Sequence, residues 1–448
     1  MSSPSTSSSS SSQDGNHSAN AAGPSNVQRG GDFEGPSSSR RRAVNEVWPE
    51  PFVEALATQV AIDASRSMGR LAAAPALANV FQICSTWRAV SRSDLLWHRL
   101  TRLVWGRTRL LQDTWRDEYV YWHRTARNFQ TRRSVHTTLY FDPSDVEDSN
   151  GFTCRCLTLS DAHLACGFAD GAVRVFHLDT RLHVNTFRPH LRDRLGPFSR
   201  AVTGIVITDS KLVFATLDGD IHVAIIGIPQ ITRRVHLGEV VNDGALVDFT
   251  GCERFWVGLY AGVPGRAFHI WDGVTEQLTF VGGTLTDPEG VRVTSRESAV
   301  ACTSSRVMVF DLTNQGLVLG DEEYRNGREI IVTSVDVSSA AYVIAERRRG
   351  LARLARLARV RQVDTMEEVC RFNVRGAAEM EAMGCMNEGY ALMCTDGVVS
   401  VWEVERGAYL YRFRERIGDV NAMVCDERHV AACSSDTTLH LWDFGAAD

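Results

Sequence analysis

Two groups of arginines carry the most distinctive chemistry in this sequence. The first is the run Arg347-Arg348-Arg349. The second lies along thirteen residues, at Arg188, Arg192, Arg194 and Arg200. A guanidinium group donates several hydrogen bonds in a fixed planar fork, which suits carboxylate and phosphate groups. The two groups therefore predict a surface that binds an acidic or phosphorylated peptide, and solvated loops are the alternative.

The residue patterns of enzymes are absent from the chain. There is no glycine-rich phosphate loop, no Gly-x-Ser-x-Gly elbow and no His-Glu-x-x-His pair. The eleven cysteines are scattered, and the closest pair, Cys154 and Cys156, has no second pair at zinc spacing. We therefore expect a non-catalytic protein without cofactor or metal, whose cysteines are reduced and buried, as in cytosolic or nuclear proteins.

The stretch from residue 77 to residue 100 predicts two amphipathic helices. In its first half the apolar residues Val80, Ile83, Cys84 and Trp87 recur at helical spacing. Ser93 then has the position of a helix N-cap, and a second helix opens with Leu95, Leu96, Trp97 and Leu100. Upstream, residues 48–56 predict a helix that starts near Pro49 and contains Phe52, Val53 and Leu56.

Together these segments resemble an F-box, the small helical adaptor that docks on Skp1 in cullin-based ubiquitin ligases. The resemblance rests on Ile-Cys-x-x-Trp-Arg at 83–88 and Asp-Leu-Leu-Trp at 94–97. It implies Skp1 contacts from Pro49, Phe52, Val53, Leu56, Val80, Ile83, Trp87, Leu96 and Trp97. A helical bundle with these residues in its own core is the alternative. The Ala-rich stretch 57–75 is longer than the usual F-box spacing, which predicts weaker or altered docking.

The segments that flank the helices differ from them in composition. Residues 1–43 are rich in Ser, Gly, Asn and Pro, which predicts a disordered tail. The tail ends in the basic run 40–42, either a nuclear-import signal or a solvated cluster. The F-box-like domain spans 44–104. A helical spacer is expected over 105–133, with an amphipathic stripe of Trp115, Tyr119 and Trp122.

From about residue 134 the hydrophobic pattern alternates with a period of two, and a repeated unit appears. Each unit has an apolar strand, a tight turn and a second strand. The second strands end at residues 176, 224, 271, 310, 402 and 442. The gap between 310 and 402 holds a degenerate unit whose first strand is predicted at Ala340–Ala345. Seven units at a mean spacing of about 44 residues are similar to WD40 repeats.

Turns and closure support this arrangement. Asp-Gly at 170–171, 218–219 and 396–397 predicts tight hairpin turns with positive φ at both residues. The chain stops soon after Trp442-Asp443, so the last unit lacks an outer strand. We expect the strand at 134–141 to pair there and remove the exposed sheet edges. The predicted fold is α+β: a small all-α F-box-like domain and an all-β, seven-bladed WD40-type propeller over 134–448.

One segment within the propeller fits neither pattern. Residues 351–359 repeat Leu-Ala-Arg every three residues, which suits neither a strand nor a helix. A distorted strand, an inserted helix and a basic import segment all stay open at this point. The net charge of −6 and the pI of about 6.1 argue against general nucleic-acid binding, and no apolar run is long enough to span a membrane.

Over essentially its full length the chain resembles plant F-box proteins with divergent WD repeats. The resemblance implies a protein of the nucleus, or of both nucleus and cytoplasm, that acts in flower and organ development. It implies Skp1 and a cullin as partners, with a protein substrate or transcriptional regulator on the propeller face. Two functions follow: the substrate receptor of a Skp1–cullin–F-box ligase, or a non-degradative nuclear scaffold for transcriptional repressors. Direct binding of nucleic acid is not expected.

Overall fold

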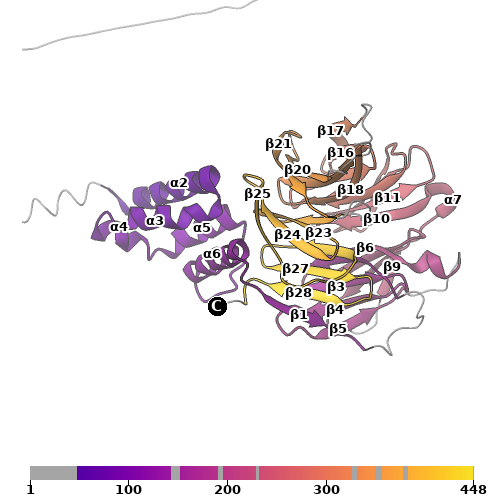
Figure 1. Ribbon diagram of the computed structural model, residues 1–448, viewed down its shortest axis with the longest axis horizontal. Coiled ribbons are helices and arrows are strands. Elements are labelled where there is room, and N and C mark those ends of the chain that lie inside the picture. Colours follow the sequence, from indigo (N-terminus) through magenta and orange to yellow (C-terminus); the bar gives the residue numbers. More distant parts are fainter. Residues whose placement is uncertain are drawn as a thin grey trace, which may run out of the picture. The chain divides into compact units, whose positions relative to one another are not determined.

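A computed structural model describes residues 48–142, 152–189, 195–228, 232–324, 330–348, 356–376 and 382–446 (Figure 1). The chain divides into two compact units, residues 1–49 and 50–448. The predicted tail at 1–43 and the basic run at 40–42 lie outside the described residues. The second unit contains the described helices and sheets.

The first elements of the second unit are helical. They are α2 (Glu50–Met68), the 3₁₀ turn η1 (Arg70–Ala72), α3 (Ala73–Phe81), α4 (Ser85–Val90), α5 (Asp94–Trp105) and α6 (Trp115–Thr131). Ser93 is the N-cap of α5, and its hydroxyl accepts a hydrogen bond from the Leu96 backbone N–H. The helix cap predicted at this residue is thereby confirmed. The stretch 57–75, expected as a filler, forms the second half of α2, η1 and the start of α3.

The single helix predicted through Val80 and Trp87 is wrong. Helix α3 ends at Phe81, and Cys84 has the extended backbone (φ −159°, ψ 174°) of the N-cap of α4. The break separates the predicted apolar face: Val80 is buried, whereas Ile83 is 61% exposed. A continuous helix would have kept these two side chains on one face.

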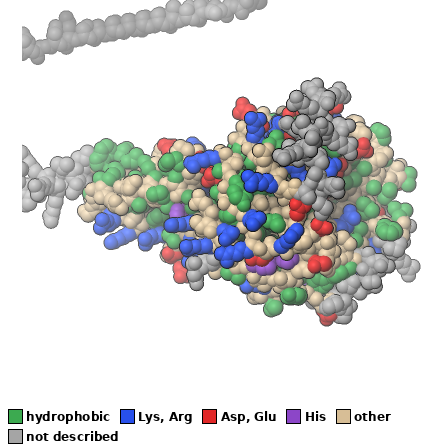
Figure 2. All heavy atoms as spheres, in the orientation of Figure 1, with side chains coloured by type: hydrophobic (Ala, Val, Ile, Leu, Met, Phe, Trp, Pro, Cys, Tyr) green, Lys and Arg blue, Asp and Glu red, His purple; other side chains and the backbone are tan. Residues whose placement is uncertain are grey.

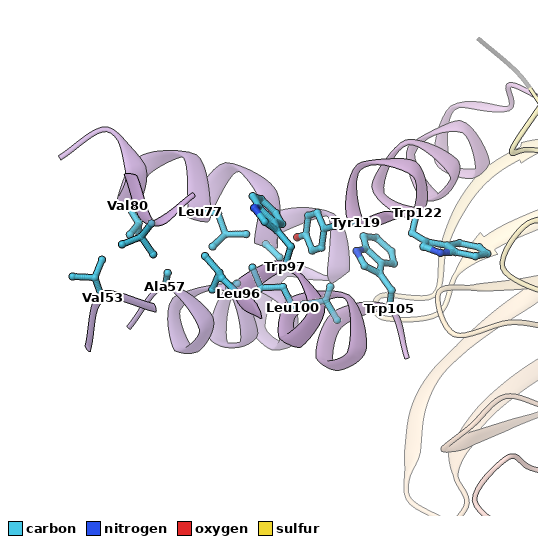
Figure 3. Packing of buried hydrophobic residues seen from close by; sticks show 14 of the residues in the cluster. Val53, Ala57, Leu77, Val80, Leu96, Trp97, Leu100, Trp105, Tyr119 and Trp122 are labelled. Atoms are coloured by element: carbon cyan, nitrogen blue, oxygen red, sulfur yellow. The ribbon is translucent and has the colours of Figure 1, made fainter. Parts of the chain in front are cut away.

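The helices share one hydrophobic core (Figure 3). Val53, Leu77 and Leu96 contribute from α2, α3 and α5, and Tyr119 and Trp122 contribute from α6. The side chain of Glu118 is buried in this region and accepts hydrogen bonds from the Leu111 and Gln112 backbone N–H groups and from the Trp122 indole. Helix α6, expected as a spacer, therefore packs as a member of the helical region.

The described residues beyond the helices contain 28 strands. Five sheets have four strands each. The first two are β2 (Cys154–Leu159), β3 (His163–Phe168), β4 (Val173–His177), β5 (His183–Phe187), and β14 (Pro288–Val293), β15 (Ser298–Thr303), β16 (Arg306–Asp311), β17 (Leu317–Glu323). The other three are β18 (Ile330–Val337), β19 (Ala341–Arg348), β20 (Arg356–Gln362), β21 (Glu368–Val374); β22 (Met383–Met386), β23 (Tyr390–Thr395), β24 (Val398–Glu403), β25 (Ala408–Arg412); and β26 (Val420–Cys425), β27 (His429–Ser434), β28 (Leu439–Asp443), β1 (Val135–Leu139).

The remaining sheet has eight strands: β6 (Val202–Ile207), β7 (Lys211–Thr216), β8 (Ile221–Ile225), β9 (Thr232–His236), β10 (Ala245–Gly251), β11 (Phe255–Ala261), β12 (Phe268–Asp272) and β13 (Leu278–Gly282). Its two halves meet where β10 pairs in parallel with β6 at Phe249 and Gly204. A Cβ on Gly204 would lie 1.7 Å from the Phe249 carbonyl oxygen, so this close approach requires glycine. Two short helical turns, η4 (Pro197–Arg200) and α7 (Val240–Asp243), flank these strands.

The first strands of the repeats form a closed ring. Strands β2, β6, β10, β14, β18, β22 and β26 each contact the next, and β26 contacts β2. The prediction of a β-propeller is thereby confirmed. Hydrogen bonds link neighbouring strands of the ring: Asp248 accepts from the Val291 backbone N–H (3.0 Å) and Asp336 from the Met386 backbone N–H (2.8 Å).

The ring closes as expected from the sequence. Strand β1 pairs antiparallel with β28, from Val135 opposite Asp443 to Leu139 opposite Leu439. Residues before the first repeat therefore supply the outer strand of the last sheet. Leu139, Leu439 and Leu441 lie in one buried apolar cluster at this closure.

Three details of the predicted strands and turns change. Asp396 and Gly397 both have positive φ (52° and 73°), but at 170–171 and 218–219 only the glycine does. There the aspartate side chains stabilise the turn, since Asp170 accepts a hydrogen bond from the Ala172 N–H and Asp218 accepts one from the Thr216 hydroxyl.

Arg347 and Arg348, expected in a turn, belong to β19. Residues 356–359 of the Leu-Ala-Arg repeat belong to β20, and residues 351–355 lie outside the described residues.

The helical region is fixed to the propeller by the end of α6. Phe129 is fully buried and stacks on Tyr390 and Phe444, with ring centroids 4.7 Å and 4.0 Å away. The Tyr390 hydroxyl donates to the Ala126 carbonyl (3.1 Å), and the Asn128 amide donates to the Phe444 carbonyl (2.9 Å). Because these contacts are buried and hydrogen-bonded, the two regions form a continuous structure.

Candidate functional site

The nine predicted Skp1 contacts separate into two groups by exposure. Val53, Val80, Leu96 and Trp97 are buried in the helical core. Pro49, Phe52 and Ile83 are exposed, and Leu56 and Trp87 are half-buried. The structure therefore divides the predicted set into residues that hold the helices together and residues that a partner protein can touch.

Trp97, predicted as an anchor for Skp1, has the contacts of a core residue. Its indole N–H donates to the Ser91 carbonyl (2.7 Å), and its ring lies 5.1 Å from that of Tyr119 and 6.3 Å from that of Phe81. Only 8% of the residue is exposed. Trp97 thus fixes the position of the connection between α4 and α5. Exposed side chains lie next to this connection.

The exposed apolar residues of the helical region include Leu95, which the sequence did not single out as a contact. Leu95 (58% exposed) joins Phe52 (44%) and Ile83 (61%). Figure 2 shows hydrophobic side chains gathered on the helical region over α2, α3 and α4. Exposed apolar residues in such numbers are typical of a protein-binding surface. We call Phe52, Ile83 and Leu95 the apolar helical surface.

The predicted arginines do not come together as one cluster. Arg188 follows β5, and Arg200 ends η4 in the link to β6. Arg347 lies in β19, in a different sheet, where it pairs in register with Arg356. Arg192, Arg194 and Arg349 lie outside the described residues, and Arg348 is described only as the last residue of β19.

Arg188, Arg200 and Arg347 nevertheless share one side of the propeller. We call it the turn face, because it carries the turns between second and third strands, such as Asp170-Gly171 and Asp396-Gly397. Gly171 lies against the Arg200 backbone, and Arg347 lies at the end of β19 that meets the start of β20. The contacts of α6 involve Tyr390 at the opposite end of β23. The end of α6 nevertheless comes near this face, where the Arg132 guanidinium donates to the Arg412 carbonyl (3.3 Å).

A cavity of about 490 Å³ opens between the fifth and sixth repeats at the turn face. Its lining comes from the end of β21, the turn before β24, and strands β24 and β25. The residues are Arg375, Gly376, Thr395, Asp396, Val398, Ser400, Trp402, Tyr409, Arg412 and Arg416. We call it the arginine pocket. Figure 2 shows Lys and Arg side chains over β24 and β25.

Sequence reasoning missed the arginine pocket because its arginines are not consecutive. Arg412, Arg414 and Arg416 alternate directly after the aromatic strand that contains Tyr409. Arg375 is 37 residues earlier and joins them only through the packing of two neighbouring sheets. Alternating arginines after an outer strand were the one signal in the sequence.

The thiols and acidic groups of the described residues do not form a reactive site. All eleven cysteines are free; seven are buried, and Cys84, Cys156, Cys252 and Cys425, expected to be buried, are half-buried. Burial raises the pKa of Cys370 to about 11 and that of Cys302 and Cys394 to about 12, so these thiols stay protonated. Across the described ranges, no group of three His, Cys, Asp or Glu side chains could hold a metal ion. No described helix has the length and apolar character needed to cross a membrane.

Comparison with known proteins agrees with this architecture. The chain is 59% identical over 439 residues to the transcriptional regulator STERILE APETALA of Arabidopsis thaliana, which covers 93% of this chain and 96% of that protein. No protein-family model matches the chain.

Two solved structures share the fold at low identity. The WD40 β-propeller domain of Doa1 matches with a TM-score of 0.51 and 12% identity, over 69% of this chain and 96% of that one. The WD40 domain of Neurospora crassa Pan2 matches with a TM-score of 0.51 and 14% identity, over 69% of this chain and 95% of that one. These two likenesses concern the fold alone.

Proposed function

Because this chain belongs to the family of the transcriptional regulator STERILE APETALA, we propose that it is a nuclear, non-catalytic substrate receptor of a Skp1–cullin–F-box ubiquitin ligase. In this role it controls the amount of a regulator of flower or organ development. The observation that carries the proposal is an apolar helical surface on a helical region that is firmly joined to a propeller. Such a chain has one surface for the ligase and another for the substrate.

The domain organisation is part of the proposal. We take the eight-stranded sheet as two blades, which gives a seven-bladed propeller of the WD40 type. The proposed regions are the tail at 1–43, the F-box-like domain at 44–104, the helical spacer at 105–133 and the propeller at 134–448. The core shared by Leu100 of α5 and Tyr119 of α6 supports a spacer that folds together with the F-box-like domain.

The mechanism requires no covalent chemistry from this chain. A receptor that binds both Skp1 and a substrate holds the substrate near the charged ubiquitin-conjugating enzyme and raises its effective concentration there. This gain depends on a fixed geometry between the two binding surfaces. The stacking of Phe129 on Phe444 and the ion pair between Arg70 and Glu427 (2.6 Å) supply that geometry.

Within the proposed Skp1 interface the residues have different tasks. Phe52 and Ile83, with half-buried Leu56 and Trp87, touch Skp1, and Pro49 sets the start of α2. Val53, Val80, Leu96 and Trp97 support them from the core. Large apolar side chains dominate the energy of such interfaces. Removing the exposed ones therefore weakens binding and leaves the fold intact.

The decisive experiment is co-purification of the full chain with Skp1 and a cullin. The double variant Phe52→Ala, Ile83→Glu places a charge in the apolar helical surface, so we expect the amount of co-purified Skp1 to fall by at least about tenfold. Leu237→Glu is the matched control, since Leu237 is a similarly exposed leucine (53%) on the propeller. Wild-type recovery of Skp1 with the double variant would contradict the ligase proposal.

The alternative is a non-degradative nuclear scaffold that joins transcriptional repressors through the propeller. The name of the Arabidopsis relative, a transcriptional regulator, favours this function. The same double variant separates the two: in a scaffold, the half-life of the propeller-bound regulator does not change. A longer half-life in the variant supports the receptor.

A further inference from the structure

The arginine pocket has an excess of positive charge that the described residues do not neutralise. Arg375, Arg412 and Arg416 line it and are exposed, and none has an ion pair within the described part of the chain. Other described arginines of the propeller do have a carboxylate partner, as Arg292 has Asp248 at 2.6 Å. Three unpaired guanidinium groups around one cavity repel one another, which favours an anionic ligand.

Two further arginines stand behind the wall of the pocket. The Arg356 side chain is buried, and its Nη1 lies 3.0 Å from the position that a Cβ on Gly376 would take. Burial lowers the pKa of Arg356, and Arg347 lowers it further, while Asp396 acts in the opposite direction. Asp396, the one carboxylate in the lining, thus acts electrostatically on Arg356.

The pocket also has an apolar floor and neutral hydrogen-bonding groups. Trp402 is 5% exposed and stacks on Phe372, with centroids 4.7 Å apart, and the ring of the 56% exposed Tyr409 lies 5.7 Å from it. Thr395 and Ser400 add hydroxyl groups. A volume of about 490 Å³ falls in the range of about 300–1,000 Å³ of ligand pockets. Such a site accepts an anionic group together with a neighbouring side chain.

We propose that the arginine pocket binds a phosphorylated side chain of an extended protein segment. A phosphate carries close to two charges and three acceptor oxygens, which matches several guanidinium forks better than one carboxylate does. The inference rests on the proposed function, since it names the chemical class of the partner that the propeller recruits. The proposed site is the pocket between the fifth and sixth repeats, whereas the sequence predicted a peptide site at the consecutive arginines.

A nucleic acid fits these observations less well. Nucleic-acid surfaces follow the phosphate backbone with a long basic stripe, whereas this positive charge surrounds one concave site. The protein as a whole carries a net charge of −6. A single phosphorylated side chain that enters a pocket between two sheets needs no extended stripe.

The test is fluorescence anisotropy of the purified full chain with two labelled peptide pools, identical except for a central phosphothreonine or threonine. We expect the phosphothreonine pool to bind at least about tenfold more tightly, and less so at high salt. Arg375→Ala and Arg412→Ala should each weaken this binding by about tenfold. Arg406→Ala is the matched control, since Arg406 is an exposed arginine at the opposite end of the sixth repeat.

A variant that binds the phosphothreonine pool more tightly than the wild type serves as a control for misfolding, because a misfolded variant would bind more weakly. Asp396→Asn removes the carboxylate, and asparagine tolerates the positive φ of this turn, so we expect about threefold tighter binding of the phosphothreonine pool. Equal affinity for the two pools, or affinity unchanged by both Arg375→Ala and Arg412→Ala, overturns the proposal. Tighter binding of a single-stranded oligonucleotide through the same arginines also overturns it. Skp1 is not part of this binding assay. A negative result for the phosphopeptide therefore does not affect the interpretation of the co-purification experiment.

Discussion

The carboxylate of Asp336 shows how one half-buried group connects folding to pH. It accepts the Met386 N–H of the neighbouring sheet, and burial raises its pKa to about 6, although Arg292 acts against this rise. The folded protein therefore holds this proton more tightly than the unfolded chain does. The contribution of Asp336 to stability is consequently greatest below about pH 4 and declines as the pH rises through about 6.

We predict that Asp336→Asn removes this penalty, because the amide oxygen still accepts the Met386 N–H without a charge. The melting temperature of the variant should exceed that of the wild type near pH 7.5, and the difference should shrink toward about pH 4.5. Thermal unfolding at several pH values measures it. A difference that does not vary with pH would show that Asp336 does not titrate as described.

Residue roles were predictable from the sequence only in part. Phe52 and Ile83 were identified and are exposed, but Val53 and Trp97 had the same pattern and are buried. Helical spacing gives the relative positions of side chains along a helix, but not which side faces a partner. The break at Cys84, which turns Ile83 outward, depends on tertiary packing that spacing does not encode.

At the scale of elements, α6 depends on its first turn. Thr114 accepts a hydrogen bond from the Asp117 backbone N–H (3.1 Å) and donates one to the Asp117 carboxylate (2.6 Å). The same helix carries Glu118, which holds the preceding loop. The N-cap therefore stabilises the helix that joins the two folded regions.

We expect Thr114→Ala to lower the free energy of unfolding by about 1 kcal/mol, because a capping hydrogen bond is lost. Chemical denaturation monitored by circular dichroism measures the change. Thr108→Ala, an exposed threonine in the same loop, should differ from the wild type by less than about 0.5 kcal/mol. Equal effects of the two substitutions would argue against the cap.

The strands were more predictable than the contacts between sheets. Period-two alternation indicated strands of the propeller, including the strand at Ala341, which begins one residue after the prediction. The parallel contact of Gly204 with Phe249 and the arginine pocket had no such signal, since each joins residues from different repeats. Local periodicity cannot encode which sheets pack together.

For the whole molecule, the junction at Phe129 decides whether helices and propeller move as one. We predict that Phe129→Ala costs about 3–5 kcal/mol, since a fully buried ring is lost between Tyr390 and Phe444. Limited proteolysis should then cleave between the regions. Val120→Ala, on the exposed side of α6, is the control and should resist as the wild type does. Resistance of both variants would contradict the role of Phe129.

Because β1 pairs with β28, the last sheet can be completed only when nearly the whole chain has been synthesised. Val135 leaves the ribosome about 300 residues before its partner Asp443, a delay of roughly 15–60 s at ordinary elongation rates. During that time β1 has no partner strand, although the helices before it have been synthesised. The incomplete sheets keep unpaired edges, which promote aggregation. A premature stop codon near the end of the message would therefore release a chain whose ring never closes, and cellular quality control would meet it as a misfolded protein.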